Sequence, residues 1–261
     1  MALRFAHWDD LPLDRAPLKE VVCQVRFQPI LAITETQPTA YQERLRKHFP
    51  KFEVRRALHF EEVQSSGIVA GLGPNEYALS SSDGAWHSTI GLNFIALTTQ
   101  AYTNWNDFKK RIGTIYTAFR ASYDDVVIGR IGLRFINELR YDNTAAKTEA
   151  ELVGIVNNDL SRLIINDAWT KAQKANVLLT LDNDREYLTI RAGYETKDQP
   201  RIVLDFDYYT ESPPSASLTQ PRLVKLLDHF HSCIYDAFRW TIKEDQVARF
   251  GPRKANRSRS K

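Results

Sequence analysis

The chain has 261 residues, of which 43% are hydrophobic and 26% are charged, and its net charge is +3. A chain of this length can bury a substantial core, as one large domain or two small ones, and its hydrophobic fraction excludes intrinsic disorder. No stretch approaches the roughly 18 consecutive apolar residues of a transmembrane helix, so we expect no membrane partner.

The N-terminal sequence MALRFAHWDDLPLDR carries acidic residues where a secretory signal would have its apolar stretch. We therefore expect a cytoplasmic protein. Cys23 and Cys233 are the only cysteines, which is too few for a disulfide framework or a cysteine-based zinc site. We expect neither a metal nor a cofactor.

Positive charge is concentrated at the C-terminal end. Five of the 35 basic residues lie in the last eleven residues, GPRKANRSRSK, and the remainder of the chain has 30 bases against 32 acids. We predict that residues 251–261 form a disordered basic tail. The tail either contacts nucleic-acid phosphates without sequence preference or promotes solubility. Its candidate phosphate contacts are Arg253, Lys254, Arg257, Arg259 and Lys261.

Apolar periodicity predicts a similar order of elements in the two halves of the chain. The first half has a strand at 20–27, a short helix at 39–48, strands near 52–62, 67–72, 76–81 and 85–98, and a long helix at 104–124. The second half has a strand at 126–141, a helix at 147–164, strands near 174–182, 186–192 and 200–209, and a long helix at 220–242.

The two predicted long helices share a hexapeptide. Ile115–Arg120 and Ile234–Arg239 are identical at five of six positions. Two shorter similarities lie upstream in the same order, namely Ile90–Phe94 with Ile202–Phe206 and Val25–Phe27 with Leu133–Phe135. We interpret these similarities as an internal duplication. The alternative is chance similarity between amphipathic segments.

Neighbouring strands joined by short turns favour antiparallel sheets with helices on one face. We therefore predict an α+β fold of two pseudo-symmetric halves, each a curved antiparallel sheet packed on its long amphipathic helix. The predicted divisions are an N-terminal arm at 1–17, a first half at 18–124, a second half at 125–250 and the basic tail at 251–261.

Several segments resemble a sporadically distributed bacterial family of about this length. The similar segments are APLKEVV at 16–22, the pair Arg26 and Phe27, Trp105 with Phe108, and RIGLRFIN at 130–137. Members of that family occur near restriction and phage-defence genes, so the resemblance implies an accessory role in phage defence. No catalytic residue is established for the family, and the resemblance assigns none here.

The predicted strand at 126–141 alternates between apolar and polar residues, which places Arg130 and Arg134 on one face. Arg26 is the repeat equivalent of Arg134, and two acidic residues share one face of the strand near 200–209. We therefore predict a polar groove lined by Arg26, Arg130, Arg134, Asp205 and Asp207. The alternative is a set of cross-strand ion pairs on a solvated sheet face.

Other candidate residues favour structural roles. His229 and His231 are two residues apart on a predicted helix and face different directions, and no cysteine or histidine partner stands at a usable spacing, so we expect packing or solvated histidines. Asp182 and Asp184 are explained by turn chemistry. Asp205 and Asp207 leave open a paired-carboxylate metal site. The sequence contains no nucleophile elbow or phosphate-binding loop.

These observations predict a non-enzymatic accessory protein that binds a protein partner, within a phage-defence system and in support of an effector that targets nucleic acid. One alternative is a nucleic-acid-binding protein that uses the basic tail and the Arg-rich strand face. A third reading is an enzyme or ligand receptor with a polar pocket between sheet and helices. A homodimer also stays open. No residue is assigned a catalytic role.

Overall fold

The computed structural model describes residues 5–63, 67–165, 173–196, 198–211, 213 and 218–253, and it describes their side chains except at 57–72. The chain forms two compact units. Unit 1 comprises Met1–Val21, Leu133–Thr210 and Leu226–Lys261, and unit 2 comprises Val22–Gly132 and Glu211–Lys225. Neither unit is continuous in sequence.

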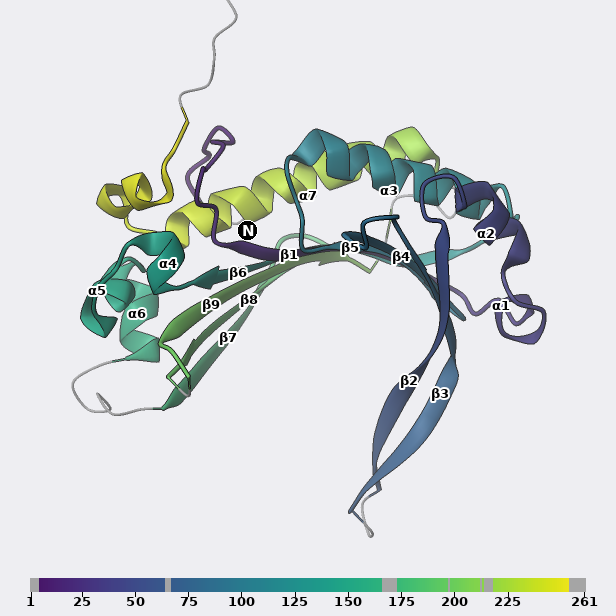
Figure 1. Ribbon diagram of the computed structural model, residues 1–261, viewed down its shortest axis with the longest axis horizontal. Helices are drawn as coiled ribbons and strands as arrows, with labels where there is room; N and C mark the ends of the chain where they lie inside the picture. The colour runs from purple at the N-terminus through teal and green to yellow at the C-terminus, as the bar shows by residue number, and fades with distance from the viewer. Residues whose placement is uncertain are drawn as a thin grey trace, which may run out of the picture. The chain divides into compact units, whose positions relative to one another are not determined.

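Unit 2 is built mainly from the first half of the chain. Its elements are β1 (Leu18–Phe27), α1 (Ala32–Glu35), α2 (Thr39–Leu45), β2 (Lys51–Val63), β3 (Gly67–Ser80), β4 (Trp86–Gly91), β5 (Phe94–Thr99) and α3 (Trp105–Arg120). The strand order is β2-β3-β4-β5-β1-β6, and β6 is Ile128–Leu139. The long strands β2 and β3 pair antiparallel as a two-stranded ribbon (Figure 1).

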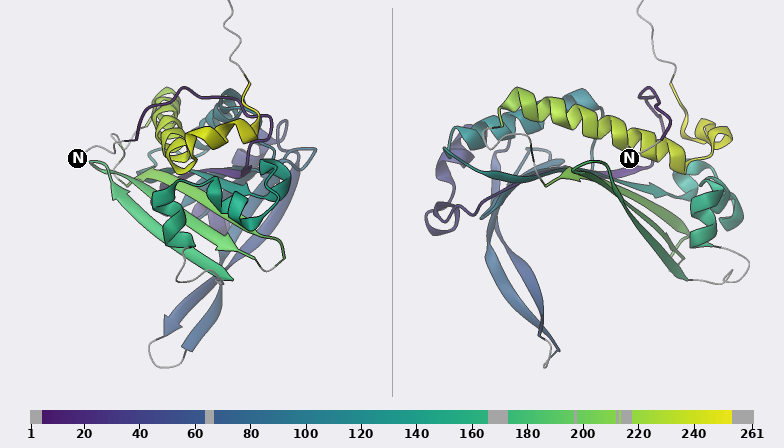
Figure 2. Two further views of the ribbon diagram at one scale, coloured as in Figure 1. Left: turned by 90° about the vertical axis from the view of Figure 1, so that its left-hand side faces the viewer. Right: turned by 180° about the vertical axis from the view of Figure 1, so that it is seen from behind.

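Unit 1 is built mainly from the second half. Its elements are α4 (Tyr141–Thr144), α5 (Glu149–Gly154), α6 (Asn158–Ile164), β7 (Lys174–Asp182), β8 (Glu186–Glu195), β9 (Arg201–Thr210), α7 (Gln220–Thr241) and the 3-10 helix η1 (Glu244–Phe250). The strand order is β6-β9-β8-β7, in which β7, β8 and β9 form an antiparallel meander (Figure 2). The predicted α+β class is confirmed, and the strands belong to a large antiparallel sheet.

The core of unit 2 follows from strand alternation and the apolar stripe of α3. The Asn104 side chain accepts a hydrogen bond from the Asp107 N–H, which fixes the start of α3. Phe119 is completely buried and its ring stacks on Phe27 of β1 with the ring centroids 4.6 Å apart. The predicted core role of Phe119 is confirmed.

The core of unit 1 lies between β9 and the part of α7 that belongs to this unit. The ring of Phe230 lies 4.9 Å from that of Tyr208, and Phe238 makes an edge contact with Phe206 at 6.4 Å. Phe238 is 8% exposed, which confirms its predicted place in the core. The N-terminal arm belongs to the same unit, because the Trp8 N–H donates to the Asp236 carboxylate.

The predicted single strand at 85–98 is wrong, because β4 and β5 form a hairpin there. Leu92 and Asn93 form its turn, and asparagine is a favoured turn residue. Gly91 leaves room for the ring of Phe94, since a Cβ at this position would lie 2.5 Å from that ring. One consequence is that the segment Ile90–Phe94 spans a turn, whereas its proposed repeat, Ile202–Phe206, lies within β9.

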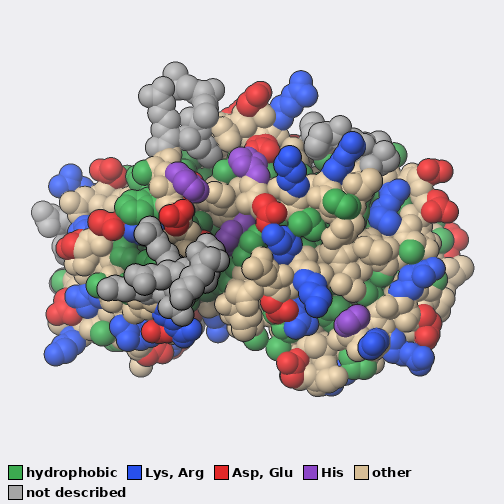
Figure 3. Space-filling model, turned by 90° about the horizontal axis from the view of Figure 1, so that it is seen from above, with side chains coloured by type: hydrophobic (Ala, Val, Ile, Leu, Met, Phe, Trp, Pro, Cys, Tyr) green, Lys and Arg blue, Asp and Glu red, His purple; other side chains and the backbone are tan. Residues whose placement is uncertain are grey.

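Two further boundaries differ from the prediction. The predicted helix at 147–164 is two helices, α5 and α6, because the Asn157 side chain accepts from the Leu160 N–H and starts a new helix. The predicted strands at 67–72 and 76–81 are one strand, β3. Within the described part of the chain, no helix is both long and apolar enough to cross a membrane. On the surface that Figure 3 presents, acidic and basic side chains are interspersed.

Candidate functional site

One face of the unit 1 sheet carries two rows of charged residues, and we call it the polar face of unit 1. Alternation along β9 produces it, because Leu204 and Phe206 point into the core and Asp205 points the other way. The charged members of the two rows are Arg134, Glu138, Arg191, Glu195, Arg201 and Asp205.

The first row has the charge order positive, negative, positive. The Asp205 carboxylate accepts hydrogen bonds from Nε and Nη2 of Arg134 at 2.8 and 2.7 Å, and from Nη1 of Arg191 at 3.2 Å. The Asp205 side chain is only 6% exposed, against 41% for Arg134 and 45% for Arg191. The hydrogen bond to Asp205 raises the pKa of Arg134 above its ordinary value. Asp205 therefore accepts three hydrogen bonds from two arginines.

The second row has the opposite charge order. Arg201 donates to Glu195 through Nη2 at 2.6 Å and to Glu138 through Nη1 at 3.3 Å. Glu138 also accepts from Nη1 of Arg140 at 3.5 Å. Cross-strand register aligns both rows, because Arg191 faces Asp205 and Glu195 faces Arg201 on neighbouring strands. The two rows are thus held by the sheet itself.

A hollow of about 410 Å³ lies between the rows, and we call it the Gly193 hollow. Gly193 stands opposite Asn176 on β7 and Val203 on β9. A Cβ at Gly193 would lie 3.0 Å from Oδ1 of Asn176, so the missing side chain gives the hollow its depth. Leu178 and Lys174 also line it, and Leu178 is 65% exposed.

The Gly193 hollow adjoins the edge strand β7. Among the strands that the structure describes, β7 neighbours only β8. An edge strand presents backbone N–H and C=O groups that another extended chain can pair with. Along β7, Asn176, Leu178 and Thr180 point to the polar face and are exposed. This edge therefore combines backbone hydrogen-bonding groups with a side-chain hollow.

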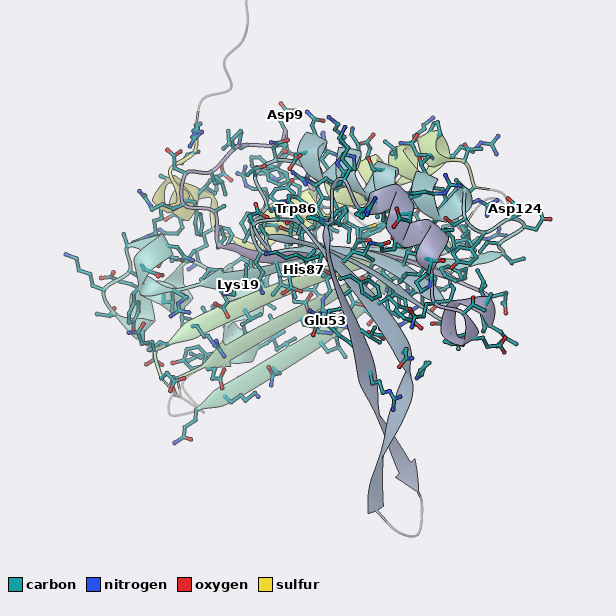
Figure 4. The ribbon with its side chains drawn as sticks, turned by 45° about the vertical axis from the view of Figure 1, so that its right-hand side comes forward. Asp9, Lys19, Glu53, Trp86, His87 and Asp124 are labelled. Atoms are coloured by element: carbon teal, nitrogen blue, oxygen red, sulfur yellow. The ribbon has the colours of Figure 1, made fainter. Side chains whose placement is uncertain are left out.

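The comparable strands of unit 2 carry fewer charges. Trp86 and His87 of β4 point to opposite faces of the sheet (Figure 4). Trp86 is buried beneath the Arg111 guanidinium, which lies 4.3 Å from the ring centroid. His87 hydrogen-bonds to Oγ of Ser80 at 2.9 Å. Around His87, this face of unit 2 combines neutral polar groups with Lys51 of β2, which lies opposite Ser80.

Of the five residues predicted to line a polar groove, Arg134, Asp205 and Asp207 belong to unit 1. Arg134 and Asp205 form the ion pair described above, and Asp207 on the same strand adds a favourable Coulombic interaction with Arg134. Arg26 and Arg130 belong to unit 2. Nε of Arg26 donates to Gln24 at 2.9 Å. The cross-strand ion pair, one of the two readings of the sequence, describes the Arg134–Asp205 contact.

The predicted phosphate contacts fall mostly outside the described residues, where Lys254, Arg257, Arg259 and Lys261 lie. Arg253 is described, and it pairs with the Asp14 carboxylate through Nε. Its backbone N–H donates to the Pro12 carbonyl at 2.9 Å. Arg253 therefore joins the N-terminal arm and is already neutralised.

A second cluster was missed by sequence reasoning, and we call it the Cys233 cluster. Nε2 of His229 lies 2.9 Å from Oε2 of Glu186, and Sγ of Cys233 lies 3.7 Å from Nδ1 and 3.8 Å from Nε2 of the same ring. The Tyr208 hydroxyl donates to Glu186 at 2.7 Å. The statement that His229 lacks a partner at usable spacing was wrong, because Cys233 follows it by four residues on one helix face.

The charges in the Cys233 cluster support one another. The contact with Cys233 and the hydrogen bond to Glu186 raise the pKa of His229 to about 10, against the opposing effect of burial. Burial alone would raise the pKa of Glu186, but hydrogen bonds from His229 and Tyr208 outweigh it and leave this pKa lowered. His229 is therefore protonated at neutral pH.

The remaining candidates have structural explanations. The ring of His231 packs against Phe135 at 5.7 Å, as expected for a packing histidine. The Asp184 N–H donates to Oδ1 of Asp182 at 3.1 Å, and Asp184 has a positive φ of 52°, which confirms the turn interpretation. Among the described residues, no group of three His, Cys, Asp or Glu side chains is arranged to hold a metal ion.

Comparison with known proteins assigns no family. No family model matches the chain, and no curated protein matches its sequence.

Proposed function

We propose that this protein is a non-enzymatic binding protein that recognises a partner protein through the polar face of unit 1 and the edge of β7. One observation carries the proposal: two charged rows of opposite order flank the Gly193 hollow beside an open strand edge. Extended peptides add to such edges by backbone hydrogen bonds, while pockets for alternate side chains provide specificity.

The charge order favours a protein over a nucleic acid. A nucleic acid presents uniform negative charge, which Glu138 and Glu195 in the second row would repel. Charges of alternating sign instead suit a protein surface that carries both signs, because complementary potentials fix the register and exclude wrong partners.

The same geometry argues against acid–base catalysis by these carboxylates. Asp205 accepts from two arginines, and Glu138 accepts from Arg140 and Arg201. A general base must lie within hydrogen-bond reach of the proton that it takes from its substrate, whereas these carboxylates are oriented by guanidinium groups. Carboxylates held between guanidinium groups instead act as fixed elements of a recognition surface.

The proposed partner segment is extended and carries an acidic side chain with an apolar stem. Leu178 and Val203 would contact the stem inside the Gly193 hollow. Lys174 lines the same hollow, and Arg191 uses only Nη1 in its hydrogen bond to Asp205. Its Nε and Nη2 groups can therefore donate to the incoming carboxylate.

We also propose that the two halves arose by duplication, each as a curved antiparallel sheet packed on its long helix. In unit 2 the first strand, β1, neighbours β5, and in unit 1 the first strand, β6, neighbours β9. In both cases the neighbour is the last strand before a long helix. The hexapeptides at the ends of α3 and α7 add support. Membership of the bacterial family and a role in phage defence rest on the sequence resemblance.

Affinity capture from the native host tests the binding function. Three forms of the full chain serve as bait: the wild type, Leu178→Glu at the hollow, and Leu163→Glu as a matched control. Leu163 lies on α6 and is 52% exposed, so both substitutions add an acid at an exposed leucine of unit 1. Lysates are treated with nuclease, and the partner is then purified and titrated against each form.

We expect the purified partner to bind the wild type and Leu163→Glu equally, and to bind Leu178→Glu at least about tenfold more weakly. A tenfold loss of affinity corresponds to about 1.4 kcal/mol of binding free energy. Equal binding by all three forms would place the interface elsewhere and refute the proposed site. Loss of every captured protein on nuclease treatment would show that nucleic acid is the ligand.

A further inference from the structure

The Cys233 cluster lies on α7, β8 and β9 and takes no part in the proposed binding surface. We infer that Cys233 is a nucleophilic thiol activated by His229 and that hydroperoxides oxidise it to a sulfenic acid. The inference does not rest on the proposed function, because none of its residues lines the Gly193 hollow.

The geometry sets a charged ring against the sulfur. Sγ of Cys233 is almost equidistant from the two ring nitrogens of His229, at 3.7 and 3.8 Å, so it faces the ring as a whole rather than one N–H group. The interaction is therefore with the delocalised positive charge of the imidazolium. A cationic group beside a partly exposed sulfur is the environment in which the reactive cysteines of proteins are found.

Glu186 keeps His229 in place and charged. Its Oε2 atom receives hydrogen bonds from both His229 and the Tyr208 hydroxyl. The Tyr208 hydroxyl in turn accepts from Nδ2 of Asn183 at 2.8 Å, which directs its own proton to Glu186. A base oriented by a third group, next to a potential nucleophile, is the arrangement by which proteins activate cysteine.

The two cysteines of the chain differ in access. Cys23 is completely buried, and burial raises the pKa of its thiol to about 12. Cys233 is partly exposed, and the His229 side chain beside it is 50% exposed, so a small reagent can reach the sulfur. Cys23 is therefore an internal control for the reactivity of Cys233.

The oxidation balances with a hydroperoxide as the only co-reactant. The thiolate sulfur attacks one oxygen of hydrogen peroxide, so that an S–O bond forms as the O–O bond breaks. The departing hydroxide takes a proton from the His229 imidazolium and leaves as water. Sulfur loses two electrons and the peroxide gains them. A thiol reductant then restores the free cysteine.

The test measures reaction rates of the full chain at neutral pH. Hydrogen peroxide is added, the sulfenic acid is trapped with a cyclic diketone, and each cysteine is followed by peptide mass. Iodoacetamide alkylation gives an independent rate for the same thiol. The variants are His229→Gln, His229→Lys, Glu186→Gln and the control His231→Gln, which lies on the same helix and packs on Phe135.

We expect Cys233 to react at least about tenfold faster than Cys23, and His229→Gln to slow both reactions of Cys233 about tenfold, because the positive charge beside the sulfur is lost. His229→Lys restores the positive charge and should recover most of the alkylation rate. His231→Gln should match the wild type. Circular dichroism identifies any variant that fails to fold. If His229→Gln does not fold, Glu186→Gln replaces it in the test, and we expect its rate to lie between those of the wild type and a variant without the histidine.

Two results would overturn the inference. The first is a rate for wild-type Cys233 no faster than that of glutathione under the same conditions. The second is an equal rate in wild type, His229→Gln and Glu186→Gln. Either would show that the histidine packs beside the thiol without activating it.

Discussion

The dipeptide Arg-Phe occurs on β1 as Arg26–Phe27 and on β6 as Arg134–Phe135, and the two copies have different surroundings. Both phenylalanines are buried, Phe27 at 4% and Phe135 at 8% exposure. The arginines differ: Arg134 makes two hydrogen bonds to Asp205, whereas Arg26 donates to the neutral side chain of Gln24. The difference originates on the neighbouring strand.

In unit 1 the acid opposite Arg134 lies in the middle of β9, where the strand holds it in register. In unit 2 the residue that the sequence repeat aligns with Asp205 is Asn93, which lies in the turn between β4 and β5. The Asn93 carbonyl accepts from the Phe27 N–H at 2.9 Å, but its side chain is an amide where β9 has the carboxylate of Asp205. The same strand motif therefore gives a row of cross-strand ion pairs only where the adjoining strand supplies an acid at the matching position.

The largest expected effects concern the cores of the two units. Replacing Phe119 or Phe238 by alanine should lower the free energy of unfolding by about 3–5 kcal/mol, because each leaves a cavity the size of a ring. Phe119 should have the larger effect, since it is completely buried and stacks on Phe27 while Phe238 is 8% exposed. Urea denaturation measures both values. Changes below about 1 kcal/mol at both positions would mean that these helix faces contribute little to the cores.

The next prediction sharpens the contrast between Arg134 and Arg26. Asp205→Asn leaves two guanidinium groups without their carboxylate, and we expect a loss of about 1–3 kcal/mol. The value is below that for a fully buried pair, because Arg134 and Arg191 are 41% and 45% exposed and solvent screens them. Arg26→Gln in unit 2 should change stability by less than about 0.5 kcal/mol. Equal effects of the two substitutions would remove the distinction.

These contacts show where the sequence was sufficient. Periodicity alone places Phe119 and Phe238 in the cores. It also predicts that Asp205 and Phe206 point to opposite faces of their strand, because alternation depends only on local backbone geometry. Periodicity could not reveal that Arg191 and Arg134, which lie on different strands, both donate to Asp205. Cross-strand register is a property of pairing between distant segments, and one sequence does not record it.

The Cys233 cluster could be predicted in part from the sequence. The spacing of four residues between His229 and Cys233 is visible in the sequence and predicts a shared helix face. The contact with Glu186 could not be predicted, because Glu186 lies 43 residues away and reaches His229 only through the packing of β8 near α7. The turn residue Asn93 could have predicted the hairpin, but the apolar residues on both sides of it favoured one continuous strand.

Unit 1 should also show a pH dependence that originates in this cluster. The pKa of His229 in the folded chain, about 10, lies above its ordinary value of 6.5, so its interactions stabilise the fold fully below about pH 6.5 and are lost as the pH rises toward 10. The pKa of Glu186 is lowered, so its contribution is present above its ordinary value of 4.5 and is lost as the pH falls through the lowered value.

We therefore expect the stability difference between wild type and His229→Gln to be largest near pH 5–6.5 and to decline toward pH 10. Its size should stay below about 1 kcal/mol, because the His229 side chain is 50% exposed and solvent screens the pair. Urea denaturation of both proteins across this pH range gives the difference directly. A difference that grows with pH would mean that the neutral, not the charged, imidazole is favoured by the fold.

The smallest expected effect on stability comes from the basic tail, and it tests whether the charged rows of unit 1 bind nucleic acid. Removing residues 254–261 takes away four bases and changes the net charge from +3 to −1, while Arg253 keeps its contact with Asp14. We expect an unchanged melting temperature.

Any affinity for duplex DNA in the full chain should have a salt slope of about −0.9 per contact, or about −3.6 for four contacts, and should vanish on truncation. The polar face should not replace it, because Glu138, Glu195 and Asp205 would face the phosphates together with the arginines. If the truncated chain still binds, and Arg134→Ala with Arg191→Ala abolishes that binding, the rows act as a phosphate-binding surface and the case for a protein partner at this face is lost.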